Sequence, residues 1–110
     1  PFWYNAAHAS AYVSVYEGFG LPVIEALACG TPTLTSSTSS LPEVGGDGVL
    51  TAPPDDETAM AGALHRLVSE HDVREQLRQQ GLERAAAFSW EKTAKDTMDV
   101  YTWALSAQGA

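Results

Sequence analysis

The sequence of 110 residues contains little positive charge, a single cysteine and no long apolar segment. Six Lys and Arg residues stand against 14 Asp and Glu residues, and the formal charge of −8 argues against a nucleic-acid-binding protein, because such proteins carry a basic surface. Cys29 is the only cysteine, so no internal disulfide can form, and no Cys and His residues have the spacing of a zinc site. No apolar segment approaches the ~20 residues of a membrane-spanning helix.

What the sequence does contain is the composition of one small globular domain. Hydrophobic residues make up 45% of the chain and charged residues 18%, which is typical of a protein that buries a core. A length of 110 residues accommodates a single domain. The chain begins at Pro1 without an initiator methionine, and we expect it to be part of a longer protein.

The composition changes near the middle of the chain. Residues 1–54 are apolar, with Gly, Pro, Ser and Thr between short runs that favour strands, whereas residues 55–108 are rich in helix-forming residues. Residues 9–15 are almost uncharged, which predicts a strand buried on both faces. The order of elements predicts an α/β fold with part of a doubly wound parallel sheet. The expected strands are 9–15, 31–36 and 49–52, and the expected helices are 22–29, 41–44, 56–71, 72–88 and 90 onward.

Several residues are expected to cap these helices or to face the core. Asp72, with Glu75 three residues later, has the pattern of a capping box. Asp55 or Asp56 is expected to cap the preceding helix, and Ser89 the last one. The residues expected to pack inward are Ile24, Leu27, Ala28, Met60, Leu64, Leu67, Val68, Val73, Leu77, Gly81, Ala85 and Phe88.

A glycine-containing turn between the first strand and the next helix is the most informative segment. It contains Gly18 and Gly20 and precedes Pro22, which is favourable in the first turn of a helix. In open α/β sheets ligands bind at the carboxyl ends of the strands, and the unpaired N–H groups of a helix N-terminus suit a phosphate group. The backbone amides of Phe19, Gly20 and Leu21 are therefore candidate ligands for an anion.

Two carboxylates, Glu17 and Glu25, bracket this turn. They would repel a phosphate in direct contact, but each can accept hydrogen bonds from sugar hydroxyls, worth about 1.5–3 kcal/mol apiece. The spacing suggests a ligand with both phosphate and sugar, such as a nucleotide sugar. Two alternatives stay open: Glu25 as a solvated helix residue, and a turn without a ligand, because the segment is neither G-x-G-x-x-G nor a P-loop.

Residues 17–32, with the sequence EGFGLPVIEALACGTP, resemble the signature of the retaining GT-B glycosyltransferases of family 4. The resemblance continues through LPEVGGD at 41–47 and RAAAFSW at 84–90, in order and with the spacing of the family. The chain departs from the family at Val13, where proline is common, and at His8, where aspartate is common. Neither departure touches the segment expected to bind the donor.

The resemblance implies a partial Rossmann-like fold, the second half of the C-terminal, donor-binding domain of a two-domain enzyme. Residues 1–88 would belong to this domain, and residues 89–110 would form a terminal helix that crosses back to an N-terminal domain outside this chain. Glu17 would contact hydroxyls of the donor sugar near its reacting carbon, as the catalytic residue, and Glu25 would hold the ribose. The diphosphate and sugar would be met by Gly18 and by the amides of Phe19, Gly20 and Leu21.

The activity implied by the resemblance is transfer of a sugar, with retention of configuration, from a nucleoside diphosphate to a sugar, lipid or small-molecule acceptor. No metal or other cofactor and no nucleic acid is expected. The expected location is the cytoplasm, with peripheral attachment to the inner face of the membrane as a variant. Because the family's diphosphate-neutralising Arg and Lys lie upstream of Pro1, we expect the chain alone to bind donor weakly and to be inactive.

Other functions stay open on the sequence alone. They are a phosphorylase- or synthase-like relative, a generic nucleotide-binding domain, and a degenerate domain that serves as a non-catalytic interaction module. Residues 36–40 form a serine-rich loop that is expected to be solvated at least as readily as to touch a donor. Surface, capping or packing roles are expected for His8, His65, His71, Glu43, Cys29, Trp90, Met98 and Tyr101.

Overall fold

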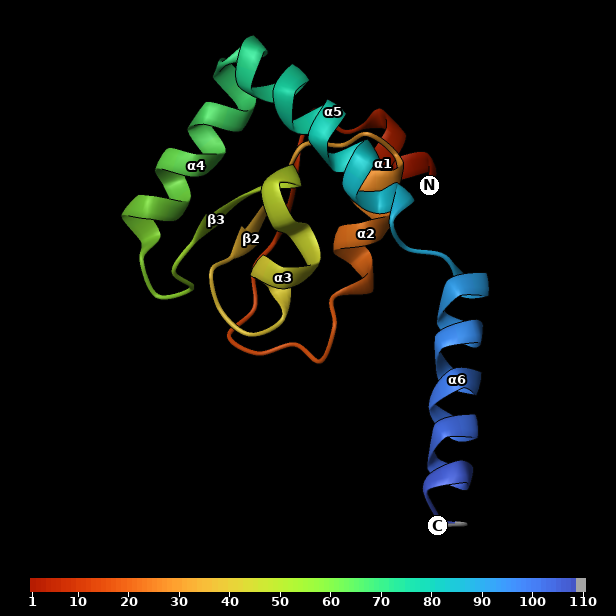
Figure 1. The fold of residues 1–110 in the computed structure, drawn as a ribbon. Helices are drawn as coiled ribbons and strands as arrows, with labels where there is room; N and C mark the ends of the chain where they lie inside the picture. Colours follow the sequence, from red (N-terminus) through yellow and green to blue (C-terminus); the bar gives the residue numbers. More distant parts are fainter. Residues whose placement is uncertain (109–110) are drawn as a thin grey trace.

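A three-stranded parallel sheet flanked by helices forms the body of the protein (Figure 1). The computed structural model describes residues 1–108. Its strands are β1 (Ser10–Tyr12), β2 (Thr33–Ser36) and β3 (Val49–Ala52). β2 is central, and its first residue, Thr33, pairs with Ser10 on one side and with Val49 on the other. The α/β class and the parallel sheet predicted from the sequence are confirmed.

Helices connect the strands and make up the second half of the chain. The helices are α1 (Phe2–Ala6), α2 (Leu21–Ala28), α3 (Leu41–Gly45), the 3-10 helix η1 (Gly46–Gly48), α4 (Glu57–Ser69), α5 (His71–Ala86) and α6 (Trp90–Gln108). Two predicted caps are confirmed: the Asp56 carboxylate accepts from the Ala59 amide (2.9 Å), and the Ser89 hydroxyl accepts from the Lys92 amide (3.1 Å). Gly30 follows α2 at φ 69°, the left-handed conformation that glycine adopts after a helix.

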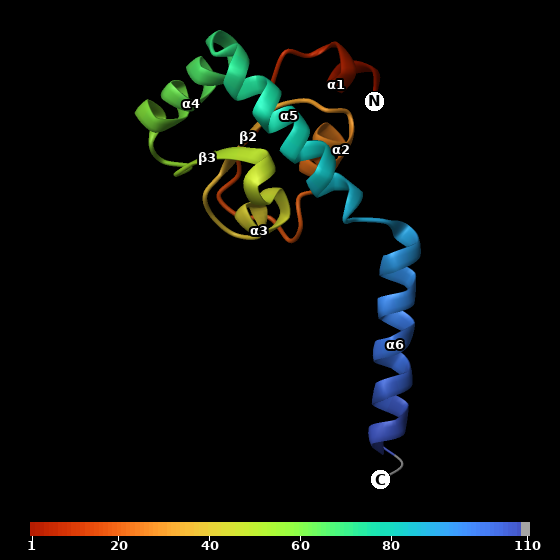
Figure 2. The same cartoon turned by 45° about the horizontal axis from the view of Figure 1, so that its top comes forward.

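Two clusters of buried apolar side chains hold the body together, and α5 contributes to both. One cluster joins α2, α3, β3 and α5 through Val23, Leu27, Leu41, Val44, Val49 and Ala85. The other joins β2, β3, α4 and α5 through Leu34, Ala52, Leu67 and Leu77. Figure 2 shows α5 running across the body from α4 toward α2. α5 therefore connects α2, the helix that follows the glycine-containing turn, to the rest of the body.

The first strand is shorter and more exposed than predicted. β1 has three residues, Ala11 is exposed, and Val15 is 79% exposed. The prediction of a strand over 9–15 that is buried on both faces is therefore wrong. The chain leaves the sheet early because the Ser14 amide donates to the hydroxyl of Ser36 (2.7 Å) and not to a carbonyl of β2.

The junction between α4 and α5 also differs from the prediction. Only Glu70 separates the two helices, and no side chain caps the first turn of α5. The capping box expected from Asp72 and Glu75 is therefore wrong. The junction is closed instead by Arg74, whose guanidinium donates to two carbonyls in the last turn of α4 (3.2 and 2.9 Å).

The predicted inward faces are confirmed in part. In α5 the residues Leu77, Gly81 and Ala85 are buried, and Phe88 lies beyond the end of the helix. In α4 Leu67 is the one buried residue. α4 meets the body along a narrow face around Leu67. Leu64 and Val68 flank Leu67 on the helix surface and therefore reach solvent. The residues predicted inward but found exposed are Ala28, Leu64 and Val68.

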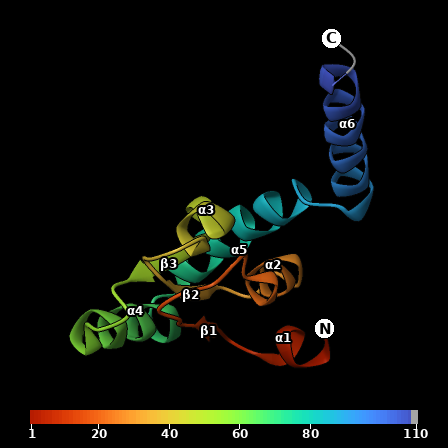
Figure 3. The ribbon, with the colours of Figure 1, turned by 90° about the horizontal axis from the view of Figure 1, so that it is seen from below.

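Helix α6 stands away from the body (Figure 3). Every residue from 91 to 103 is exposed, including Met98 and Tyr101, which are among the residues with an expected surface, capping or packing role. The radius of gyration is 16.6 Å, compared with about 13 Å for a compact chain of this length, because α6 extends the molecule. Met98 and Tyr101 are each 60% exposed.

Candidate functional site

The candidate site lies at the carboxyl edge of the sheet, where the loops after β1 and β2 meet. Residues 13–20 connect β1 to α2, and residues 37–40 connect β2 to α3. Because β1 and β2 are parallel neighbours, both loops leave the sheet at the same edge, as Figure 1 shows below β2. Glu17 lies in the first loop, and the serine-rich loop is the second.

Two hydroxyl groups hold the side chain of Glu17. The hydroxyls of Ser14 (2.7 Å) and Tyr12 (2.9 Å) both donate to its Oε1 atom. These bonds, the one from Ser14 foremost, lower the pKa of the Glu17 carboxyl, and the same contact with Glu17 is the main cause of a raised pKa at Tyr12. Glu17 is therefore an ionised acceptor whose second oxygen, Oε2, has no hydrogen-bond donor among the described residues.

The serine-rich loop holds the backbone of the same residue. The Ser39 hydroxyl accepts from the Glu17 amide (2.9 Å) and donates to the Glu17 carbonyl (2.6 Å). The Ser40 hydroxyl lies within hydrogen-bonding distance of the carbonyls of Glu17 (3.0 Å) and Phe19 (2.8 Å). This role could not be predicted from the sequence, because a serine-rich segment does not indicate which backbone groups it will contact.

Gly18 and Gly20 shape the turn in different ways. Gly20 is buried at φ 102°, and a Cβ on it would lie 2.7 Å from Cδ2 of Leu41, so a side chain is excluded there. Nothing lies within 4 Å of the corresponding position on Gly18, which leaves open space beside the turn. Within residues 1–108 the amides of Gly18, Phe19, Gly20 and Leu21 donate no hydrogen bond, and these amides lie at the N-terminus of α2.

An aromatic contact links this turn to the end of α5. The ring of Phe19 meets that of Phe88 edge to face, with centroids 5.8 Å apart. The Arg84 guanidinium lies 4.9 Å from the centre of the Phe88 ring and donates to the carbonyls of Glu43 and Val44 in α3. The turn, α3 and the segment leading into α6 are thus connected by one cation and two rings.

Glu25 lies in separate surroundings from Glu17. It is exposed in α2, as predicted, and its neighbour is Tyr4 of α1. Burial first, and then the negative charge of Glu25, raise the pKa of Tyr4. The Glu25 carboxylate is therefore accessible to a ligand that reaches along α2.

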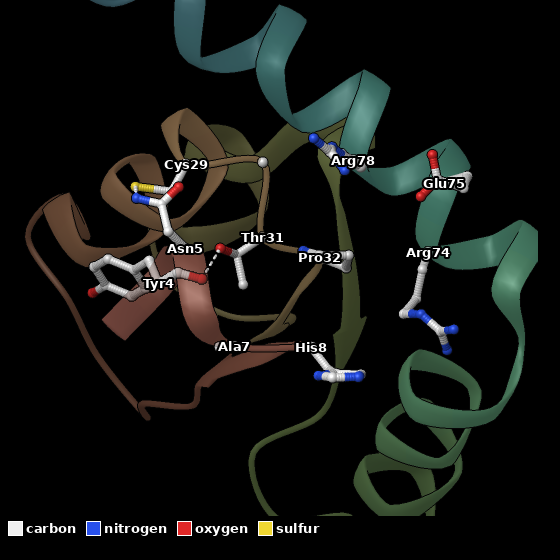
Figure 4. A pocket seen from close by; sticks show the side chains of 11 residues that line it. Tyr4, Asn5, Ala7, His8, Cys29, Thr31, Pro32, Arg74, Glu75 and Arg78 are labelled. Atoms are coloured by element: carbon white, nitrogen blue, oxygen red, sulfur yellow. Dashed lines mark hydrogen bonds between the residues drawn. The ribbon is translucent and has the colours of Figure 1, made fainter. Parts of the chain in front are cut away.

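A hollow of about 210 Å³ lies at the opposite end of the sheet, before the first residues of β1 and β2 (Figure 4). α1, α5 and the segment leading into β2 line it, and there the Thr31 hydroxyl donates to the carbonyl of Tyr4 (2.8 Å). None of the candidate site residues lines this hollow, so it is separate from the site at the carboxyl edge.

Among residues 1–108 no three His, Cys, Asp or Glu residues are grouped so that they could hold a metal ion. No helix in this range is both long enough and apolar enough to span a bilayer.

A family model described as glycosyl transferases group 1 matches residues 1–84. The chain belongs to this family. The match includes both loops of the candidate site and the whole of α2. It confirms the family recognised from the segments at 17–32 and 41–47.

Curated relatives of this glycosyltransferase-family chain cover nearly all of it. O-antigen chain mannosyltransferase B of Escherichia coli is 42% identical over 92% of the chain. The MMP alpha-(1->4)-mannosyltransferase of Mycolicibacterium hassiacum is 40% identical over 96%, and the D-inositol 3-phosphate glycosyltransferase of Streptomyces bingchenggensis is 37% identical over 94%. The chain spans about a quarter of the length of these relatives (26%, 26% and 23%).

A solved structure shares the fold as well as the sequence. Sucrose-phosphate synthase from Thermosynechococcus elongatus superposes with a TM-score of 0.81 and 35% identity, over 96% of this chain and 27% of that one. The GT-B type of α/β fold predicted from the sequence is thereby confirmed.

Proposed function

We propose that the chain is the donor-binding part of a retaining glycosyltransferase, which moves a sugar from a nucleoside-diphosphate sugar to a sugar, lipid or small-molecule acceptor. One observation carries the proposal: an ionised carboxylate, Glu17, with a free oxygen, stands one to four residues before backbone amides that have no acceptor. The family supports the reaction class, and the mannosyltransferases among its relatives make mannose the first donor sugar to test.

The unpaired amides suit the diphosphate of such a donor. Amides 18–21 precede or begin α2, so that hydrogen-bond donors and the positive end of the helix dipole coincide. The open space beside Gly18 lets a ligand approach the backbone closely. Glu25, further along α2, would accept hydrogen bonds from the ribose hydroxyls of the nucleoside.

Glu17 suits the sugar and the charge that develops on it. Its free oxygen would accept a hydrogen bond from a donor hydroxyl near the anomeric carbon, and its charge would stabilise the positive charge that builds up there. The bond from the anomeric carbon to the diphosphate oxygen breaks, and a bond to the acceptor oxygen forms on the same face. The acceptor proton passes to the leaving phosphate, so no covalent bond to Glu17 is required.

The rest of the enzyme would lie outside this chain. Residues 1–88 would belong to the donor domain, and residues 89–110, mostly α6, would return to an N-terminal domain that binds the acceptor. The chain alone, at a formal charge of −8, would repel an anionic donor, so we propose that it binds donor weakly and is inactive by itself. Nucleotide sugars are made in the cytoplasm, which is the location we propose.

A transfer assay on the full-length protein tests the proposal. The assay follows release of nucleoside diphosphate from a panel of donors, GDP-mannose first, and the anomeric configuration of the product by NMR. We expect retention of configuration, and Glu17→Gln is expected to lower kcat about 100-fold or more. The control is Glu75→Gln, because Glu75 is an exposed glutamate at the other end of the sheet. Inversion, or full activity of the Glu17 variant, would contradict the proposal.

A further inference from the structure

The serine-rich loop has an unusual backbone at the residue that touches Glu17. Ser39 has φ 61°, and it is the only residue other than glycine with positive φ among those the structure describes. Glycine takes this conformation freely, whereas a side chain makes it unfavourable. Ser39 is exposed, so burial of its side chain does not compensate for this.

Hydrogen bonds of the Ser39 hydroxyl offset the cost of this backbone conformation. This group bonds both the amide and the carbonyl of Glu17, so it fixes the plane of the backbone on either side of that residue. The Ser40 hydroxyl adds hydrogen bonds to the carbonyls of Glu17 and Phe19. A carbonyl held toward the loop turns the following amide away from it, so these bonds set the direction of the amides at Gly18 and Gly20.

We propose that Ser39 and Ser40 are positioning residues of the donor site, which hold the Glu17 carboxylate and the amides that follow it in one orientation for the donor. This inference rests on the proposed function and names the residues on which the geometry of its site depends. Neither serine needs to touch the donor. The neighbouring Ser37, exposed in the same loop and without a side-chain hydrogen bond, would have no such role.

The variant Ser39→Gly separates positioning from stability. Glycine adopts the positive φ without strain, but it has no hydroxyl and therefore loses both hydrogen bonds to Glu17. If Ser39 served only the stability of the loop, the substitution would leave the melting temperature and ligand binding unchanged or improved. In the full-length protein we expect the melting temperature to stay within about 2 °C of wild type, while the Kd of the preferred nucleoside diphosphate (UDP, GDP or ADP) rises about tenfold. Ser40→Ala is the second test variant, and Ser37→Ala is the control in the same loop.

Hydrogen exchange gives a readout that does not depend on activity. Peptides covering 15–21 are expected to exchange faster in Ser39→Gly than in wild type or Ser37→Ala, because the Glu17 amide loses its acceptor. If wild-type protein binds a nucleoside diphosphate and Ser39→Gly binds it equally well, the inference is overturned while the proposed function stands. If wild-type protein binds none of the three, the proposed function fails and this inference fails with it.

Discussion

Gly18 and Gly20 lie two residues apart in one turn, yet their surroundings assign them different roles. Gly20 has a left-handed backbone and faces the buried side chain of Leu41, so its lack of a Cβ serves the fold. Gly18 has open space beside it, so we propose that its lack of a Cβ serves the approach of a ligand. At the scale of residues, the same amino acid is therefore expected to support stability at position 20 and, under the proposed function, binding at position 18.

Alanine at each position separates these roles. Gly20→Ala is expected to lower the free energy of unfolding by about 1–3 kcal/mol, because the backbone strain and the contact with Leu41 cannot both be relieved. Gly18→Ala is expected to leave that free energy nearly unchanged and to weaken nucleoside-diphosphate binding about tenfold. Thermal unfolding and calorimetric titration of the full-length protein measure the two effects. The same loss of stability in both variants would contradict the assignment.

The carboxyl of Glu17 gives a second test at this scale. Replacing Tyr12 by Phe or Ser14 by Ala removes one hydrogen bond from Oε1, so the pKa of Glu17 is expected to rise toward its ordinary value, more for Ser14→Ala. Because the pKa is lower in the folded state than in the unfolded chain, the stability this group contributes is present above the unfolded pKa and is lost as pH falls through the folded one. NMR titration of the Glu17 side chain measures the shift; an unchanged pKa in both variants would show that these hydroxyls do not hold the carboxylate.

At the scale of elements, two glycines allow α5 to approach η1 closely. A Cβ on Gly48 would lie 2.9 Å from the Cα of Gly81 and 3.1 Å from its amide nitrogen. These are backbone atoms, so relief requires movement of a whole helix. Since α5 also supplies Leu77 and Ala85 to the two buried clusters, its position affects the body on both sides.

A pair of glycine variants tests this contact. Gly48→Ala is expected to destabilise the protein by about 1–3 kcal/mol, as overpacking of a tight contact does. Gly62→Ala is the matched control: Gly62 is exposed within α4 with nothing within 4 Å, so alanine is expected to stabilise the protein by about 0.5–1 kcal/mol through helix propensity. Opposite shifts in melting temperature support the account, and a stabilising Gly48→Ala would refute it.

Some of these elements could be predicted from the sequence and others could not. The strand 49–52 and the cap at Asp56 follow from local signals, a β-rich run before two prolines and an acidic residue before a helix. The length of β1 depends on a residue distant in sequence, because the Ser36 hydroxyl accepts from the Ser14 amide, and the α4–α5 junction depends on the Arg74 side chain, which donates to carbonyls of α4. Local pattern does not encode such contacts.

The candidate site, too, could be predicted only in part from the sequence. The residue types and spacing around Glu17 and the two glycines predict a ligand-binding turn, and this stays a prediction, whereas the placement of the turn beside the loop after β2 is seen in the structure. The hold of Ser39 and Ser40 on the turn could not be read from the sequence, since it depends on the parallel pairing of β1 with β2, which brings their following loops together.

At the scale of the whole molecule, α6 is the element without support. Most of its length meets solvent, and its aromatic side chains are exposed, Trp90 to 74% and Trp103 to 69%. A single helix without tertiary packing is marginally stable in water. The body and α6 are therefore expected to differ sharply in local stability.

Hydrogen exchange of the isolated chain tests this expectation. Peptides from α6 are expected to exchange at least tenfold faster than those from α5, because only the latter is packed. In the full-length protein, where the proposed second domain would cover α6, the same peptides are expected to be protected. Equal protection of α6 with and without the rest of the protein would contradict the division at residues 88 and 89.

The most direct test of the central claim is a calorimetric titration of the full-length protein with UDP, GDP and ADP, for wild type, Glu25→Ala and the exposed control Glu75→Ala. The account predicts saturable binding of one nucleotide, weakened about tenfold or more by Glu25→Ala (~1.4 kcal/mol) and unchanged in the control. Absence of binding by well-folded wild-type protein would contradict the donor-binding function and would favour a degenerate domain that serves as an interaction module.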